Sequence, residues 1–181
     1  AGDKMHGALL GPEFSDDEIE TVLRSHQAVY ERLEDAALLS RTVQLLQQEN
    51  VIGWVQGRME FGPRALGNRS ILGDPRSAQM QSVMNLKVKF RESFRPFAPA
   101  VRVEKAAEHF ELDAESPYML LVAPVKASLR RPPSESIPGL DRVKQVRSTL
   151  PAVPHVDYSA RIQTVRREDN PRFYALLEQF D

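Results

Sequence analysis

The sequence has 181 residues, of which 41% are hydrophobic and 27% charged, ordinary values for a globular domain. It has no cysteine, which excludes disulfides and thiolate metal sites, and no apolar run approaches the roughly 20 residues of a membrane span. The net charge of -1 hides a basic centre, because residues 58–105 contain ten Lys or Arg against four Asp or Glu. A local basic centre in an otherwise acidic chain favours a small anionic ligand over nucleic acid.

The first third of the chain predicts a leader and two helices. Residues 1–14 are punctuated by glycine and proline, and we expect a leader or an interdomain linker there. Ser15-Asp16-Asp17-Glu18 matches a capping box, so a helix is expected to begin at this point. Apolar residues at helical spacing predict a second helix over about 35–49. The short β-rich run 51–55 predicts a buried strand.

The remainder predicts alternating strands and helices. We expect residues 57–73 to form a long polar loop, and Asp74-Pro75 to begin a helix. The later expected elements are a strand within 97–103, a short helix at 104–110, a buried strand at 118–125, strand-like segments around a turn within 153–165 and a helix from Asn170-Pro171. The charged, proline-rich segment 126–150 is expected to be a mobile loop. This alternation indicates the α/β fold class.

Arginines and glycines are mixed in the run directly after the first predicted strand. Arg58, Arg64 and Arg69 lie within twelve residues of the stretch Gly57 to Ser70. Glycines let backbone N–H groups approach a ligand closely, and guanidinium groups bind phosphate oxygens without losing their charge. Loops at strand ends are the usual ligand sites of α/β sheets. The run therefore predicts an anion site, although spacing alone leaves open a solvated loop with structural glycine turns.

A second basic stretch follows at residues 87–99. Lys89, Arg91 and Arg95 fall at odd positions, so an extended backbone would place their charged ends on one side. The alternative is the end of an amphipathic helix, where basic residues interact favourably with the helix dipole.

A third stretch, residues 155–165, combines hydrogen-bonding side chains of every type. Arg161, Gln163 and Thr164 supply donors and acceptors within four residues. A half-buried edge strand is the alternative for Gln163. The other histidines, His6, His26 and His109, show no metal-ligand spacing, and we predict no metal site in this chain.

These stretches together resemble the C-terminal domain of the carbamoyltransferase family that includes the nodulation protein U proteins and antibiotic O-carbamoyltransferases. The matching runs are 53–72, 89–99, 155–157 and 160–165. The resemblance extends from about Leu10 to the end. It implies a YrdC-like domain over residues 15–181, with a twisted mixed sheet and packed helices. It also implies a fragment of a larger protein, shortened at its C-terminal end.

The resemblance implies a two-part reaction. In the family, the YrdC-like domain uses carbamoyl phosphate and ATP to make carbamoyl adenylate. An N-terminal Kae/ASKHA-type domain, which holds a transition metal through histidines, then transfers the carbamoyl group to an acceptor hydroxyl. We therefore expect a cytoplasmic transferase domain that binds ATP with its magnesium, lacks a membrane partner and depends on a domain outside this chain.

The resemblance also assigns candidate residues. Lys89 and Arg64 are the expected catalytic cations. The candidates for binding substrate and nucleotide are Arg58, Arg69, Arg91, Arg95, Arg147, Arg161, Gln163 and Thr164. Cations are needed because two anionic substrates repel each other, and positioned positive charge would offset that repulsion. Two other classes stay open, namely an RNA-binding module, against which the acidity counts, and an interaction domain that docks against the partner.

Overall fold

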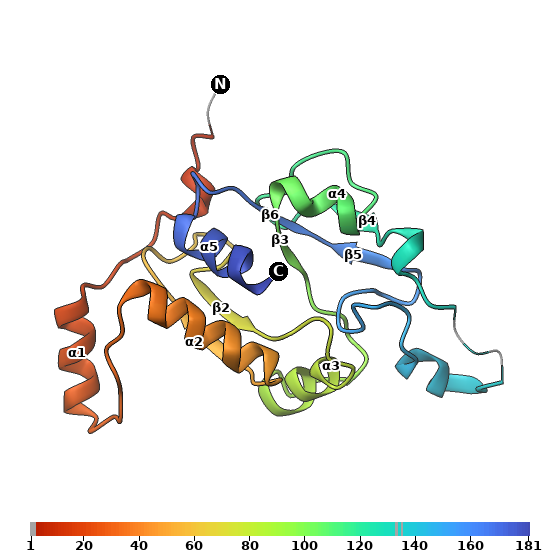
Figure 1. Ribbon diagram of the computed structural model, residues 1–181, viewed down its shortest axis with the longest axis horizontal. Helices are drawn as coiled ribbons and strands as arrows, with labels where there is room; N and C mark the ends of the chain where they lie inside the picture. The colour runs from red at the N-terminus through yellow and green to blue at the C-terminus, as the bar shows by residue number, and fades with distance from the viewer. Residues whose placement is uncertain (1–2, 133, 135) are drawn as a thin grey trace.

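Short strands and helices alternate along the computed structural model, which describes residues 3–132, 134 and 136–181 (Figure 1). The helices are α1 (Asp16–Ser25), α2 (Asp35–Gln47), α3 (Met80–Val83), α4 (Ala106–His109) and α5 (Pro171–Phe180). The strands are β1 (Ile52–Val55), β2 (Arg69–Leu72), β3 (Ala100–Arg102), β4 (Val122–Pro124), β5 (Ser159–Arg161) and β6 (Gln163–Val165). Shorter helical turns are η1 (His6–Ala8), η2 (Met84–Val88, a π-helix), η3 (Val103–Lys105), η4 (Ala127–Leu129) and η5 (Gly139–Lys144). The predicted α/β class is confirmed.

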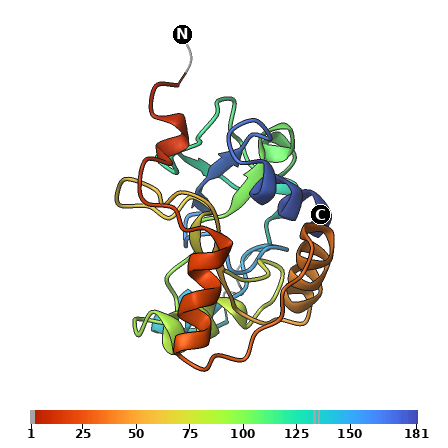
Figure 2. The same cartoon turned by 90° about the vertical axis from the view of Figure 1, so that its left-hand side faces the viewer.

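Local capping determines where the longer helices begin. The Ser15 hydroxyl accepts the Glu18 N–H, and the Glu18 carboxylate accepts the Ser15 N–H, so the predicted capping box is confirmed. Asn170 caps α5 by accepting the Phe173 N–H at 3.3 Å. Helix α1 buries none of its residues and stands apart from the body in Figure 1, whereas α2 lies beside α5 in Figures 1 and 2.

The segment 159–165 is the centre of the strand arrangement. Its first part, β5, pairs antiparallel with β4, and its second part, β6, pairs parallel with β3. Between them, the Ile162 N–H donates to the Leu121 carbonyl at 3.1 Å. The pair β1 and β2 is separate and antiparallel, with Val55 opposite Arg69. The described strands therefore form three two-stranded sheets of mixed direction.

Two apolar clusters cover this strand arrangement. One cluster consists of Val101, Ala106, Phe110, Ala123, Val125, Val153, Ala160 and Ile162. The other joins α2, β1 and α5 through Val43, Trp54, Val165, Phe173, Tyr174 and Leu176. Because β3, β5 and β6 contribute to these clusters, the strand segment 159–165 is held firmly. No helix in the described part of the chain is long and apolar enough to cross a membrane.

Two predictions around residues 57–80 are wrong. The loop ends at Gly67-Asn68 rather than at residue 73, because residues 69–72 pair with β1 as β2. Asp74-Pro75 does not begin a helix. The Asp74 carboxylate instead accepts the N–H and the guanidinium of Arg76, at 2.8 and 2.9 Å, and closes a turn before α3.

The predicted strand 118–125 is shorter and more exposed than expected. Strand β4 covers only Val122–Pro124, and Leu120 and Val122 are exposed. Met119 adopts a positive φ of 54°, which breaks the extended run. An apolar run was therefore a poor guide to burial here, as it was in β1, where Trp54 alone is buried.

The basic stretch after α3 follows the alternative interpretation. Helix η2 continues to Val88 with Lys89 as its C-cap, so an extended backbone at Lys89 is wrong, whereas Arg91 and Arg95 lie in the irregular segment beyond the helix. In the segment 126–150, η4 and η5 alternate with a bridge between Arg130 and Ser148. Residues 133 and 135 of that segment lie outside the described residues, and its predicted mobility stays a prediction.

Candidate anion-binding site

The loop between β1 and β2 is organised around a buried carboxylate. One oxygen of Glu60 accepts the N–H groups of Leu66, Asn68 and Arg69 at 2.7, 2.8 and 3.3 Å. The Gln163 amide donates to the Leu66 carbonyl at 2.7 Å, which ties the loop to β6. Two of the three basic or polar stretches singled out in the sequence therefore meet, and Gln163 contributes to that contact.

Arg64 and Arg161 are two half-buried guanidinium groups without an acidic partner. Arg64 belongs to the loop, and Arg161 is the last residue of β5. The Nε of each is buried and has no hydrogen-bond partner. Burial, and then the positive charge of Arg64, lower the pKa of Arg161, so the two charges influence one another. Neither forms an ion pair within the described residues. Two desolvated, mutually repelling cations form a site that an anion would stabilise.

Arg69 and Arg58 donate their hydrogen bonds to backbone carbonyls of the protein. Arg69 donates to the carbonyls of Gln56 and Asn68, both at 2.7 Å, and to the Gly57 carbonyl at 3.1 Å. Arg58 donates to the Gly11 carbonyl at 3.3 Å and lies 3.8 Å from the Glu13 carboxylate. These two candidates fasten the loop and the segment preceding α1.

Arg147 and Thr164 are likewise engaged in local structure. Arg147 is buried, and its terminal nitrogens donate to the carbonyls of Arg142, Val143 and Gln145. The Thr164 hydroxyl accepts the Ser116 N–H at 2.8 Å, which extends the contact between β6 and the chain before β4. Both side chains stabilise their surroundings as they stand.

Lys89, Arg91 and Arg95 lie on the segment that follows η2. Lys89 is exposed, whereas Arg91 donates to Asn85 at 2.6 Å and lies over the Phe97 ring. Arg95 pairs with Glu92 at 2.8 Å. This segment lies apart from the loop between β1 and β2 in both views (Figures 1 and 2). No hydrogen bond or ion pair joins it to Arg64 or Arg161 within the described residues.

The structure adds four residues that sequence reasoning missed. Besides Glu60, the side-chain amides of Gln56, Asn68 and Asn170 form a buried cluster. Gln56 donates to Asn68 and Asn170 at 3.0 and 2.6 Å, and Asn170 donates to Asn68 at 2.7 Å. The one signal available in the sequence was Glu60, a single acid inside a basic run.

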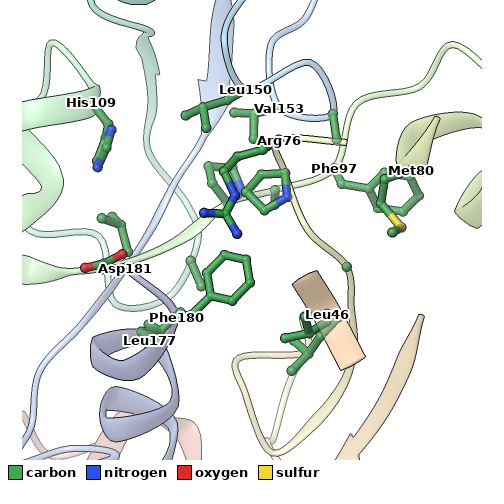
Figure 3. Close-up of a pocket in the computed structure, with 18 of the residues that line it drawn as sticks. Leu46, Arg76, Met80, Phe97, His109, Leu150, Val153, Leu177, Phe180 and Asp181 are labelled. Atoms are coloured by element: carbon green, nitrogen blue, oxygen red, sulfur yellow. The ribbon is translucent and has the colours of Figure 1, made fainter. Parts of the chain in front are cut away.

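An apolar cavity of about 320 Å³ lies elsewhere, between α5, the end of β2 and β3 (Figure 3). Leu46, Met80, Phe97 and Phe180 contribute to its wall, and the Arg76 guanidinium lies 4.5 Å from the centre of the Phe180 ring. None of the candidate residues lines this cavity. Its wall also carries Arg76, His109 and Asp181, but Arg76 is paired with Asp74 and Asp181 with Arg102. We therefore place the candidate site at Arg64 and Arg161, which have no acidic partner within the described residues.

Comparison with known proteins gives the family. The profile described as "Carbamoyltransferase C-terminus" matches residues 43–181. The chain belongs to the carbamoyltransferase family. It is similar to an uncharacterized protein of Synechocystis, 56% identical over 99% of this chain and 30% of that protein. It is similar to the nodulation protein NolNO of Sinorhizobium fredii, at 41% over 98% of this chain and 24% of that protein.

Cephem O-carbamoyltransferases are also among the relatives of this carbamoyltransferase domain. The 3'-hydroxymethylcephem-O-carbamoyltransferase of Amycolatopsis lactamdurans is 44% identical over 72% of this chain and 21% of its own length. The chain spans less than a third of the length of the curated relatives named here. All ten candidate residues lie within residues 43–181, the range that the family profile matches.

Proposed function

We propose that this carbamoyltransferase domain binds carbamoyl phosphate and ATP and forms carbamoyl adenylate. The observation that carries the proposal is the pair Arg64 and Arg161, whose buried guanidinium nitrogens have no acidic partner. Phosphate oxygens would supply the missing acceptors and negative charge. Family membership and the printed activity of the cephem-modifying relatives support carbamoyl transfer as the chemistry.

The proposed step needs two anions brought together. Water releases inorganic phosphate from carbamoyl phosphate, a carbamate oxygen then bonds to the α-phosphorus of ATP, and pyrophosphate leaves. The role of Arg64 and Arg161 is to reduce repulsion between the substrates and to stabilise charge on the departing phosphate groups. Within the described residues no three His, Asp or Glu side chains gather into a ligand set. Magnesium would therefore enter bound mainly to ATP oxygens.

The remaining family features stay proposals. A YrdC-like sheet would be completed in the longer polypeptide, and a Kae/ASKHA-type N-terminal domain would pass the carbamoyl group to an acceptor hydroxyl. A cytoplasmic location fits these substrates. The candidates Arg58, Arg69 and Gln163 would then hold the loop that carries Arg64. The candidates Arg91, Arg95, Arg147 and Thr164 are bonded to their own surroundings, and their role in binding substrate stays a proposal.

The direct test is ATP–pyrophosphate exchange that depends on carbamoyl phosphate, measured in the longest natural polypeptide containing these residues. Arg64→Ala should reduce exchange. Losing a charge-assisted hydrogen bond costs roughly 1.5–3 kcal/mol, or about 10- to 150-fold. Exchange without any need for carbamoyl phosphate, or full exchange in Arg64→Ala, would contradict the proposal.

Lys89 is the second proposed catalytic cation, and its segment lies apart from the Arg64 loop in this structure, so it has its own test. Lys89→Ala should change the free energy of unfolding by no more than ~0.5 kcal/mol, because the side chain is exposed. The substitution should still reduce the rate of ATP–pyrophosphate exchange by roughly 10- to 150-fold if the ammonium binds phosphate. Lys87→Ala is the matched control, since Lys87 is an exposed neighbour on η2. Normal exchange in Lys89→Ala would remove this residue from the site.

A further inference from the structure

Glu60 is the one acid in the loop between β1 and β2, yet it does not neutralise the arginine four residues away. Its side chain is buried, with 7% exposed. No ion pair links it to Arg64 within the described residues. Its Oε1 is occupied instead by the three N–H groups of Leu66, Asn68 and Arg69. A carboxylate that accepts several backbone N–H groups is satisfied without a cation.

The same loop is clamped from the other side. Gln163 on β6 donates to the Leu66 carbonyl, and Ser70 accepts the Gly67 N–H at 2.9 Å. Gly67 has a φ of +111°, and a Cβ there would lie 2.4 Å from the Phe173 ring. Only glycine permits this close approach to α5. The backbone from Leu66 onward is therefore fixed against β6 and α5.

The amide cluster extends the clamp to the start of α5. Asn68 accepts from Gln56 and Asn170, and its own amide donates to the Arg58 carbonyl at 2.8 Å. Asn170 is also the N-cap of α5. Arg64 lies two residues before Leu66, where the fixed backbone begins. It belongs to the part of the loop that the hydrogen bonds of Glu60 to the backbone of Leu66 and Asn68 hold together. Its position relative to Arg161 thus depends on the Glu60 contacts.

We propose that Glu60 is a positioning residue that holds Arg64 beside Arg161 and leaves both guanidinium groups unneutralised for the anionic substrate. The inference rests on the proposed function. In this role Glu60 acts through the loop backbone, whose N–H groups it accepts. Misplacing a substrate-binding group by about 1 Å can cost on the order of 100-fold in rate. The position of the Glu60 oxygen that accepts the three backbone N–H groups matters for the site, and the negative charge of Glu60 does not.

Geometry and charge can be separated with two variants in the longest natural polypeptide. Glu60→Gln keeps the side-chain length and an acceptor oxygen, and should bind carbamoyl phosphate within about threefold of the wild type. Glu60→Asp keeps the charge but shortens the side chain by one methylene. It should weaken binding and lower kcat/KM by roughly 10- to 100-fold. The reverse order, with Asp normal and Gln impaired, would overturn the inference.

A mutant cycle tests whether Glu60 acts through Arg64. Glu60→Ala and Arg64→Ala should each reduce carbamoyl phosphate affinity, and the double variant should lose no more than Arg64→Ala alone. Independent, additive losses would overturn the inference. Where Glu60→Ala does not fold, the Gln and Asp variants decide. Asp74→Ala is the matched control, because Asp74 is a comparably buried carboxylate, 6% exposed, that also accepts a backbone N–H. It should lower the melting temperature without changing affinity.

The two proposals fail differently. Wild-type affinity and exchange in Arg64→Ala would show that the proposed anion site is wrong. Weak binding in Arg64→Ala, together with normal binding in all three Glu60 variants, would reject only the positioning role.

Discussion

Two groups of arginines in this domain use the same side chain in opposite ways. Arg102 on β3 is surrounded by acids, with Asp181 at 2.6 Å, Glu104 at 3.5 Å and Glu178 at 3.6 Å. Its hydrogen bond to Asp181 raises the pKa of the guanidinium. Arg64 and Arg161 have no such partner, and burial lowers the pKa of Arg161.

This difference between Arg102 and the pair Arg64 and Arg161 indicates which guanidinium charges are available to a ligand. A guanidinium enclosed by carboxylates is already neutralised and holds two segments together. A guanidinium with a buried, unpartnered nitrogen keeps its positive charge unneutralised and can still donate a hydrogen bond to a ligand. The absence of an acidic partner is therefore a better criterion for a substrate-binding arginine than the number of arginines in a stretch. Arg58 and Arg69 use their guanidinium groups in contacts with the protein itself. Arg147 is intermediate, because its buried Nε has no partner while its terminal nitrogens donate to three backbone carbonyls.

Binding should separate the groups most strongly. Arg161→Ala should weaken carbamoyl phosphate binding by roughly 10- to 150-fold, since a charge-assisted hydrogen bond is lost. Arg102→Ala should leave the affinity within about twofold of the wild type when both variants are folded. Calorimetric titration of the longest natural polypeptide measures this. Equal losses in the two variants would break the distinction.

Stability should separate them in the opposite direction. Arg102→Ala leaves three carboxylates near one another without their shared cation. Since these acids are 42–47% exposed, solvent screening limits the cost to about 1–2 kcal/mol. Arg161→Ala relieves repulsion with Arg64, and should change the free energy of unfolding by no more than ~0.5 kcal/mol. Urea unfolding of both variants checks the order, and a larger loss in Arg161→Ala would contradict it.

The smallest expected effect is a pH dependence in the Arg102 group. The Tyr174 hydroxyl donates to Glu104 and holds the pKa of that carboxyl below its usual range. A depressed folded-state pKa stabilises the protein above the unfolded value, and this contribution is lost as the pH falls below about 4. Tyr174→Phe should cost roughly 0.5 kcal/mol at pH 7, and its difference from the wild type should shrink in acid. A constant difference from pH 7 to pH 3 would contradict the assignment.

Local signals predicted part of the fold well. The capping box at Ser15 and the Asn170-Pro171 pair located the starts of α1 and α5, because a cap satisfies backbone groups within one turn. Strands were predicted less well. Residues 69–72 looked like loop until their pairing with β1 was known, and half of the residues in the apolar run 118–125 are exposed. Strand formation depends on partners that the local sequence does not contain.

The candidate site shows the same division. From the sequence alone came the inventory: the arginines, the glycine-rich run and the resemblance to carbamoyltransferases, which the family match confirms. Only the tertiary structure decided which cations lack partners, because the deciding contacts join distant segments. Arg102 meets Asp181 across 79 positions, Gln163 reaches Leu66 across 97, and Gln56 reaches Asn170 across 114. A guanidinium's availability depends on the acids and carbonyls that folding brings within about 3 Å of it, and sequence order does not determine those neighbours.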